Sequence, residues 1–383
     1  MKRLMIGLAA LAAWLLVLGW LGVGSSAQAA STDCDPARPH TAGDFNEMIV
    51  SGAITRDYIL HVPPSYSGDK AVPLVVNLHG LGSSAAGQAS YSGLPAKADA
   101  EGFIVVMPQG LSTALVAQPH WNIVLLGAPE ADDLGFIADL LDALESQLCV
   151  DSDRIYAAGM SNGAQMTSRL ACSLSDRIAA AAPVSGVYFP PLAVELPEPG
   201  CPSARPVPII AFHGTADTII PFDGGPLGEA IGFDFTLRDI DDEIMPDWAA
   251  RNGCDSVPTE EPVTVNVRLI RYQGCDKGAT VELYVIDGGA HVWPGATDLP
   301  DPDVNDEISA NDLLWDFFVA HPFVAQPVGG LAVDLDGDQS GLSLGATDSF
   351  GGNALLLAGI IAGVSVIATT VTGVAGYARR RLR

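Results

Sequence analysis

Short apolar runs rich in valine, isoleucine and alanine recur along this 383-residue chain, and each ends at a glycine. Five runs have this form: "PLVVNLHG" (73–80), "GFIVVMPQG" (102–110), "RIYAAG" (154–159), "IAAAAPVSG" (178–186) and "PVPIIAFHG" (206–214). Such runs are typical of buried parallel strands, and glycine permits the turn that follows. Helical periodicity occupies 132–148, where an aspartate provides the N-cap, and 162–172. The alternation predicts an α/β fold with a doubly wound, mostly parallel sheet.

Both ends of the chain differ from this body. Two basic residues precede an uncharged stretch that closes with "AQA", so we predict an N-terminal signal peptide over residues 1–29. An uncleaved membrane anchor is the alternative, because the apolar part is long for a signal. Residues 354–378 are uncharged and long enough to form a C-terminal transmembrane helix. Arginines in 379–383 then predict a cytoplasmic basic tail and a body outside the cell.

The region between these segments divides into a folded domain and a linker. We expect one domain over residues 30–322 and a flexible, acidic, glycine-rich stalk over 323–353. Within the stalk, "DLDGD" (334–338) has some features of a calcium loop. Its glycine falls at the fourth position and no glutamate follows at the twelfth, so the pattern indicates an acidic linker rather than a metal site.

The chain is strongly acidic, with a formal net charge of −26 at pH 7. The basic terminal segments make the body between them more acidic still. Such a field repels nucleic acid and favours neutral or cationic ligands. A saline habitat is the alternative explanation, because net charge governs solubility and partners rather than fold. We therefore expect no nucleic-acid partner.

Six cysteines fit an oxidising compartment, and their even number permits three disulfides with 15 possible pairings. No pair has the spacing of a metal site. Two local pairings are expected: Cys149 with Cys172, which bracket the serine motif described next, and Cys254 with Cys275, which flank a short segment leading into a strand.

The stretch Gly159–Gly163 has the pattern GxSxG where a predicted strand passes into a predicted helix. In this context the serine occupies a sharp turn that exposes its hydroxyl above the sheet edge, and the two glycines avoid collisions with the neighbouring strand and helix. Ser161 is therefore a candidate nucleophile. A serine hydroxyl reacts only beside a general base, so the motif requires partners elsewhere.

Two residues later in the chain provide those partners. Asp217 lies in "FHGTAD" after a predicted strand, and His291 lies in "DGGAHVWPG" after the predicted strand 280–287. The order serine, acid, histidine is that of α/β hydrolases. His291 would accept the serine proton and return it to the leaving group, while Asp217 would orient the imidazole. Asp223 and Asp247 are weaker candidates for the acid.

The tetrahedral intermediate needs backbone donors for its oxyanion. "LHGLG" (78–82) follows a predicted strand, so we expect the N–H groups of Leu81 and Asn162 to form the oxyanion hole, with an ordinary tight turn as the alternative. Trp121 and Trp293 border the predicted site. Their rings could stack against substrate or serve only in packing. The aspartates at 132 and 133 indicate a helix start rather than catalytic acids.

Taken together, the sequence resembles the polyhydroxybutyrate depolymerase and feruloyl esterase family of the α/β hydrolases. The resemblance extends from about Asp57 to His321 in matching order. It is carried by "LVVNLHG", "HWN" (120–122), "DDLGFI" (132–137), "CVDSDRIYAAGMSNGAQM" (149–166), "LACSLSDRIAAAAPVSG" (170–186), "PVPIIAFHGTADTIIPF" (206–222) and "GGAHVWPG" (288–295).

The resemblance implies a secreted serine esterase that acts on polyesters of the polyhydroxyalkanoate type or on feruloyl and acetyl conjugates, without cofactor or metal. It implies Ser161, Asp217 and His291 as the triad. One departure is "LHGLG", where many members have a polar or cysteine-containing continuation. Two alternatives remain: a serine peptidase of the same fold, and a surface-binding protein with an idle site. The sequence predicts an enzyme on the extracellular face of the membrane, acting on a neutral ester.

Overall fold

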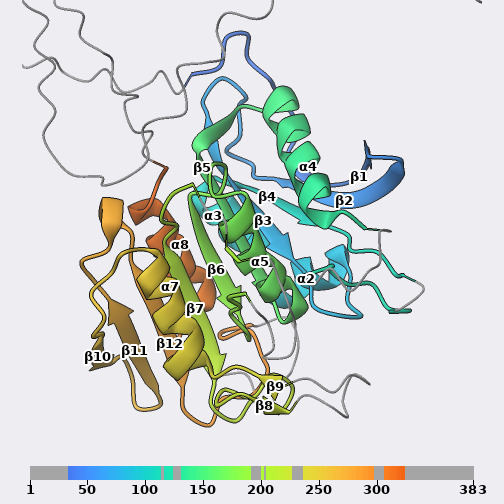
Figure 1. Cartoon of the computed structure of the whole chain (residues 1–383). Helices are drawn as coiled ribbons and strands as arrows, with labels where there is room; N and C mark the ends of the chain where they lie inside the picture. The colour runs from blue at the N-terminus through green and yellow to red at the C-terminus, as the bar shows by residue number, and fades with distance from the viewer. Residues whose placement is uncertain are drawn as a thin grey trace, which may run out of the picture. The chain divides into compact units, whose positions relative to one another are not determined.

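The computed structural model describes residues 33–113, 116–123, 131–190, 200–201, 204–226, 236–296 and 306–323. A ten-stranded sheet runs through these residues (Figure 1). Its strands, in spatial order, are β1 (Gly43–Ser51), β2 (Ile54–Val62), β4 (Ile104–Pro108), β3 (Val72–Leu78), β5 (Val150–Met160), β6 (Ala180–Val184), β7 (Ile209–Gly214), β12 (Val281–Ile286), β11 (Val267–Tyr272) and β10 (Thr259–Pro262). The six central strands from β4 to β12 are parallel, and the two at each edge pair antiparallel.

Helices cover both faces of this sheet (Figure 1). One face carries α4 (Asp133–Gln147), α5 (Asn162–Ser173) and α7 (Met245–Arg251), the last preceded by the π-helical turn η1 (Ile240–Ile244). The other carries α2 (Ala85–Ser92), α3 (Leu94–Glu101) and α8 (Ala310–Ala320). A 3-10 turn, η2 (Asp276–Gly278), and a small separate hairpin of β8 (Gly225–Pro226) and β9 (Thr236–Leu237) complete the described elements.

The central strands are buried on both faces, which explains their apolar composition. In β3, Leu74, Val76 and Leu78 pack with the layer of α4 and α5, while Val75 packs with the opposite layer. All four side chains are fully buried. The predicted doubly wound, mostly parallel sheet is therefore confirmed, whereas the antiparallel edge strands were not predicted.

The predicted helix starts are also confirmed. Asp132 caps α4, its side chain accepting the N–H of Gly135 at 2.9 Å. Asp133 adds a buried ion pair that the sequence does not reveal: Arg56 Nη2 lies 2.7 Å from Asp133 Oδ1, and both side chains are at most 2 % exposed. The pair ties β2 to the start of α4.

Three disulfides join the six cysteines: Cys34–Cys149, Cys172–Cys201 and Cys254–Cys275. The predicted bridge between 254 and 275 is confirmed. The predicted bridge between 149 and 172 is wrong, because Cys149 directly precedes β5 and pairs with Cys34, whereas Cys172 lies near the far end of α5 and pairs with Cys201. Closeness in the sequence did not predict which cysteines lie close together in the fold.

The predicted signal peptide, transmembrane helix and basic tail lie outside the described residues, as does the predicted stalk beyond Phe323. The acidic pattern at 334–338 lies outside them too. In the part of the chain that the structure describes, no helix has both the length and the apolar character needed to cross a bilayer.

Candidate active site

Ser161 occupies a strained turn between β5 and α5. Its φ of 58° and ψ of −122° fall where side-chain-bearing residues rarely lie, and its N–H donates to the Val184 carbonyl at 2.9 Å. A Cβ at Gly159 would lie 2.5 Å from the Gly163 oxygen, and one at Gly163 would lie 2.2 Å from the Leu78 oxygen. The motif therefore needs both glycines for close packing.

Asp217 and His291 come together at the same edge of the sheet. Asp217 follows β7 and His291 follows β12, the parallel neighbour of β7. The loops are joined by the Ala216 N–H, which donates to the Gly289 carbonyl at 2.9 Å. His291 Nδ1 lies 2.7 Å from Asp217 Oδ2. Because a carboxylate accepts, Nδ1 carries the proton and Nε2 is left as the base.

The Asp217 carboxylate is fully buried, but it is well supplied with donors. Oδ1 accepts from the N–H groups of Ile219 and Ile220, both at 2.8 Å. Burial by itself would raise the pKa of Asp217, yet the hydrogen bonds from His213 and His291 outweigh it and hold that pKa well below its usual range. The group therefore stays ionised beside His291.

His213, which lies in β7, is a residue that the sequence interpretation missed. Its Nε2 lies 2.9 Å from the Ile220 carbonyl oxygen and 3.3 Å from Asp217 Oδ2. A signal was present, because His213 precedes Asp217 by four residues across a glycine turn.

The His291 loop also approaches the serine turn. Ser161 donates to the carbonyl of Val184, and the next residue, Ser185, lies with its Oγ 3.4 Å from the carbonyl oxygen of Val292. Among the described residues, no hydrogen bond joins Ser161 Oγ to His291. Catalytic hydrogen bonds are often long without substrate. That Ser161 Oγ and His291 Nε2 approach each other when substrate binds is therefore an expectation.

The loop after β3 lies directly against the nucleophile turn. A Cβ at Gly80 would lie 3.3 Å from the Ser161 Cβ. His79 Nε2 accepts the Gly110 N–H at 2.9 Å, so its Nδ1 carries a proton and donates to the Gly80 carbonyl at 2.7 Å. Burial lowers the pKa of His79, which keeps the ring neutral in this arrangement. In a trans peptide C=O and N–H point in opposite directions, so the Leu81 N–H is aimed away from His79.

Asn162 is the first residue of α5, so its N–H is one of the four that find no partner within a helix. Its side chain brackets Trp121: Oδ1 accepts the Trp121 N–H at 2.7 Å, and Nδ2 donates to the Trp121 carbonyl at 3.2 Å. The Trp121 indole N–H donates to the His79 carbonyl at 2.8 Å. Trp121 thus links the two segments expected to form the oxyanion hole.

Both tryptophans are packing residues in this structure. Trp121 is 1 % exposed and Trp293 is fully buried, with its indole N–H donating to Asn311 Oδ1 at 3.1 Å. Of the two roles that the sequence left open for Trp121 and Trp293, this burial favours packing over stacking against substrate. Of the weaker acid candidates, Asp223 is exposed and Asp247 pairs with Arg238. Neither contacts His291.

Comparisons with known proteins show which family the chain resembles. The family described as Esterase PHB depolymerase matches residues 56–194. The protein named "Putative esterase NocK" of Nocardia uniformis is 32 % identical over 263 residues, which cover 66 % of this chain and 74 % of that protein. This chain belongs to the PHB depolymerase and feruloyl esterase family of the α/β hydrolases.

Other known proteins are also similar to this chain. Feruloyl esterase B of Piromyces equi is 35 % identical over 237 residues, which span 62 % of this chain but only 42 % of that enzyme. Feruloyl esterase D of Neurospora crassa is 27 % identical over 307 residues, covering 76 % of this chain and 91 % of the relative. The solved acetyl xylan esterase of Aspergillus awamori shares the fold, with a TM-score of 0.50 at 15 % identity over 72 % of this chain and all of that one.

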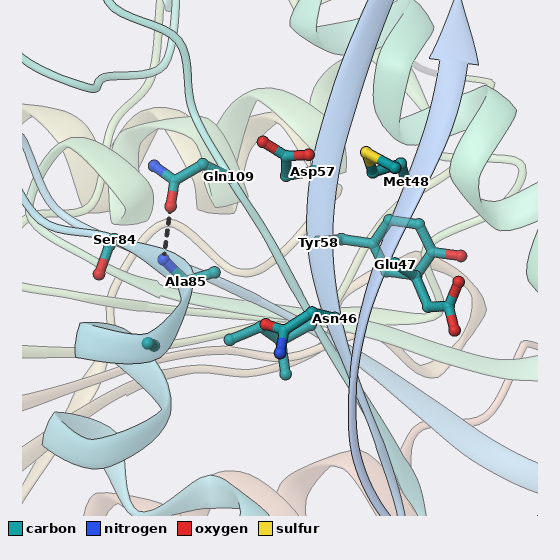
Figure 2. A pocket seen from close by; sticks show the side chains of 10 residues that line it. Asn46, Glu47, Met48, Asp57, Tyr58, Ser84, Ala85 and Gln109 are labelled. Carbon is teal, nitrogen blue, oxygen red and sulfur yellow. Dashed lines mark hydrogen bonds between the residues drawn. The ribbon is translucent and has the colours of Figure 1, made fainter.

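A groove of about 450 Å³ lies between β1, β2 and the start of α2 (Figure 2). It is lined by Asn46, Glu47, Met48, Asp57, Tyr58, Ile59, Ser84, Ala85, Ala86 and Gln109. Gln109 connects it to the site, because its Oε1 accepts the Ala85 N–H at 2.9 Å and its Nε2 lies 3.1 Å from His79 Nε2. The groove contains none of the three candidate catalytic residues.

Proposed function

We propose that this chain hydrolyses carboxylic esters through an acyl-serine intermediate. Ser161 Oγ attacks the ester carbonyl carbon while His291 Nε2 takes the hydroxyl proton, and Asp217 stabilises the resulting imidazolium. The N–H groups of Leu81 and Asn162 hold the oxyanion. The tetrahedral intermediate collapses, the C–O bond breaks and the alcohol leaves with the proton from His291. Water, deprotonated by the same imidazole, then releases the acid.

The observation that carries this proposal is the hydrogen bond of 2.7 Å between His291 Nδ1 and a buried, ionised Asp217. It fixes the tautomer that a general base needs. The strained Ser161 turn at the same edge of the sheet supports it.

The substrate class follows from the relatives and from the charge. Matching relatives are described as feruloyl esterases, and one as an acetylxylan esterase joined to a xylanase. We infer that the chain acts on uncharged feruloyl or acetyl esters, or on polyesters of the polyhydroxyalkanoate type. The net charge of −26 disfavours anionic substrates.

We further propose that the enzyme is exported and held at the outer face of the membrane by residues 354–378. Three disulfides are in keeping with an oxidising compartment. The apolar stretch and the arginines after it support the orientation.

A substrate panel tests the function. Purified protein is assayed with nitrophenyl acetate, methyl ferulate and a chromogenic dipeptide, and Ser161→Ala is compared with Ser146→Ala, an exposed serine on α4. We expect ester turnover to exceed amide turnover and to fall about 10⁴–10⁶-fold only in Ser161→Ala. Faster dipeptide cleavage would favour a peptidase, and unchanged ester turnover in Ser161→Ala would refute the proposal.

A further inference from the structure

A second histidine contacts the acid of the candidate triad. The His213 and Asp217 side chains are both fully buried, and the two lie 3.3 Å apart between Nε2 and Oδ2. Oδ2 is the same oxygen that accepts the His291 Nδ1–H. The described titratable groups that contact this carboxylate are thus His213 on β7 and His291 in the loop after β12.

The hydrogen-bond partners of His213 fix its proton. The Ile220 carbonyl lies 2.9 Å from Nε2 and can only accept, so Nε2 carries the hydrogen, and Asp217 Oδ2 lies 3.3 Å from the same nitrogen. His213 Nδ1 is buried without a hydrogen-bond partner among the described residues. It faces Gly186, where a Cβ would lie 3.5 Å from it.

Buried polar atoms nearly always have hydrogen-bond partners, so an unpartnered Nδ1 is unusual for a histidine that serves only in packing. All the polar contacts of His213 are made through Nε2, and both are directed at the Asp217 loop. Ile219 and Ile220 donate to the other carboxylate oxygen. The His213 ring therefore contacts one carboxylate oxygen of Asp217, while backbone N–H groups bond the other.

We propose that His213 is a positioning residue, whose Nε2–H fixes the Asp217 carboxylate and draws part of its charge away from His291. The inference rests on the proposed function. Its consequence for pH has a definite sign. Without this N–H, more negative charge stays on the oxygen that faces His291, so the imidazolium is stabilised and His291 titrates at a higher pH.

Two variants of similar size separate this role from a general packing role. In His213→Gln the side-chain amide can place a donor near the position of Nε2, whereas in His213→Asn it ends near the position of Nδ1 and cannot reach Asp217 or Ile220. We expect His213→Gln to keep kcat for nitrophenyl acetate within about threefold of wild type. We expect His213→Asn to lose about tenfold in kcat with KM nearly unchanged, the size of a weak hydrogen bond to a charged group.

The decisive readouts are the acid limb of the kcat/KM profile and the low-field NMR resonance of the His291 Nδ1 proton, assigned by its loss in His291→Gln. Both should titrate about half a pH unit higher in His213→Asn than in wild type, and His213→Gln should not shift. Equal losses in the two variants without any shift would overturn the inference, as would wild-type behaviour of His213→Asn. The NMR titration needs no turnover, so it stays informative if Ser161→Ala refutes the esterase proposal.

Discussion

Replacing Asp217 by asparagine tests how the acid controls its neighbour. Oδ1 accepts the N–H groups of Ile219 and Ile220, so the amide oxygen of an asparagine must take that position. Its NH₂ group then faces His291 Nδ1, which lies 2.7 Å from Oδ2. Two donors cannot bond, and the imidazole regains a hydrogen bond only by moving its proton to Nε2.

A ring protonated at Nε2 cannot accept the proton of Ser161. By analogy with other triads whose acid becomes an amide, we expect kcat to fall about 10⁴-fold. This equals about 5 kcal/mol of transition-state stabilisation. KM should change little, because Asp217 is fully buried and does not touch the ester. The near-identical volume should preserve the fold.

The assay is steady-state hydrolysis of nitrophenyl acetate at neutral pH, with circular dichroism to confirm folding. Asp223→Asn is the matched control, because Asp223 is exposed and was the other candidate acid in this region. It should retain wild-type turnover. A loss of less than tenfold in Asp217→Asn, or an equal loss in both variants, would refute this reasoning.

Three further predictions concern stability, each measured by urea unfolding. Gly163→Ala places a Cβ 2.2 Å from the Leu78 oxygen and should lower the free energy of unfolding by about 3 kcal/mol or more, whereas a loss near zero would mean that the turn relaxes freely. Arg56→Met leaves Asp133 buried without its partner and should cost about 3–5 kcal/mol, part of which Asp133→Asn in the same chain should restore. The lowered pKa of Asp217 contributes stability that is present above about pH 4 and lost as the pH falls toward the folded-state pKa, so unfolding stability should decline less steeply with acid in Asp217→Asn.

The sequence predicted the parallel centre of the sheet because strands buried on both faces have a recognisably apolar composition. The runs at 73–80 and 154–159 are mostly apolar, and they fall in β3 and β5. The edge strands β1 and β10 lack such an apolar run. β10 is exposed along its length and carries "TEEP", so its composition does not differ from that of a loop.

The candidate triad was predictable because its members follow separate strands in a known order. The side-chain partners were not, because they depend on how loops close in space. His213 precedes Asp217 by four residues, but this spacing does not show whether its ring contacts the acid or only packs. The pairing of Cys34 with Cys149 spans 115 residues of chain, so it could be found only once the sheet had been assembled.

Covalent labelling tests most directly whether Ser161, His291 and Asp217 act together. The protein is treated with a fluorophosphonate, and the adduct is located by peptide mass spectrometry in wild type and in His291→Gln. We predict one adduct on Ser161, formed at least about 10³-fold more slowly in His291→Gln because the general base is lost. An adduct on another residue, or labelling of Ser161 at an equal rate in both proteins, would contradict the account.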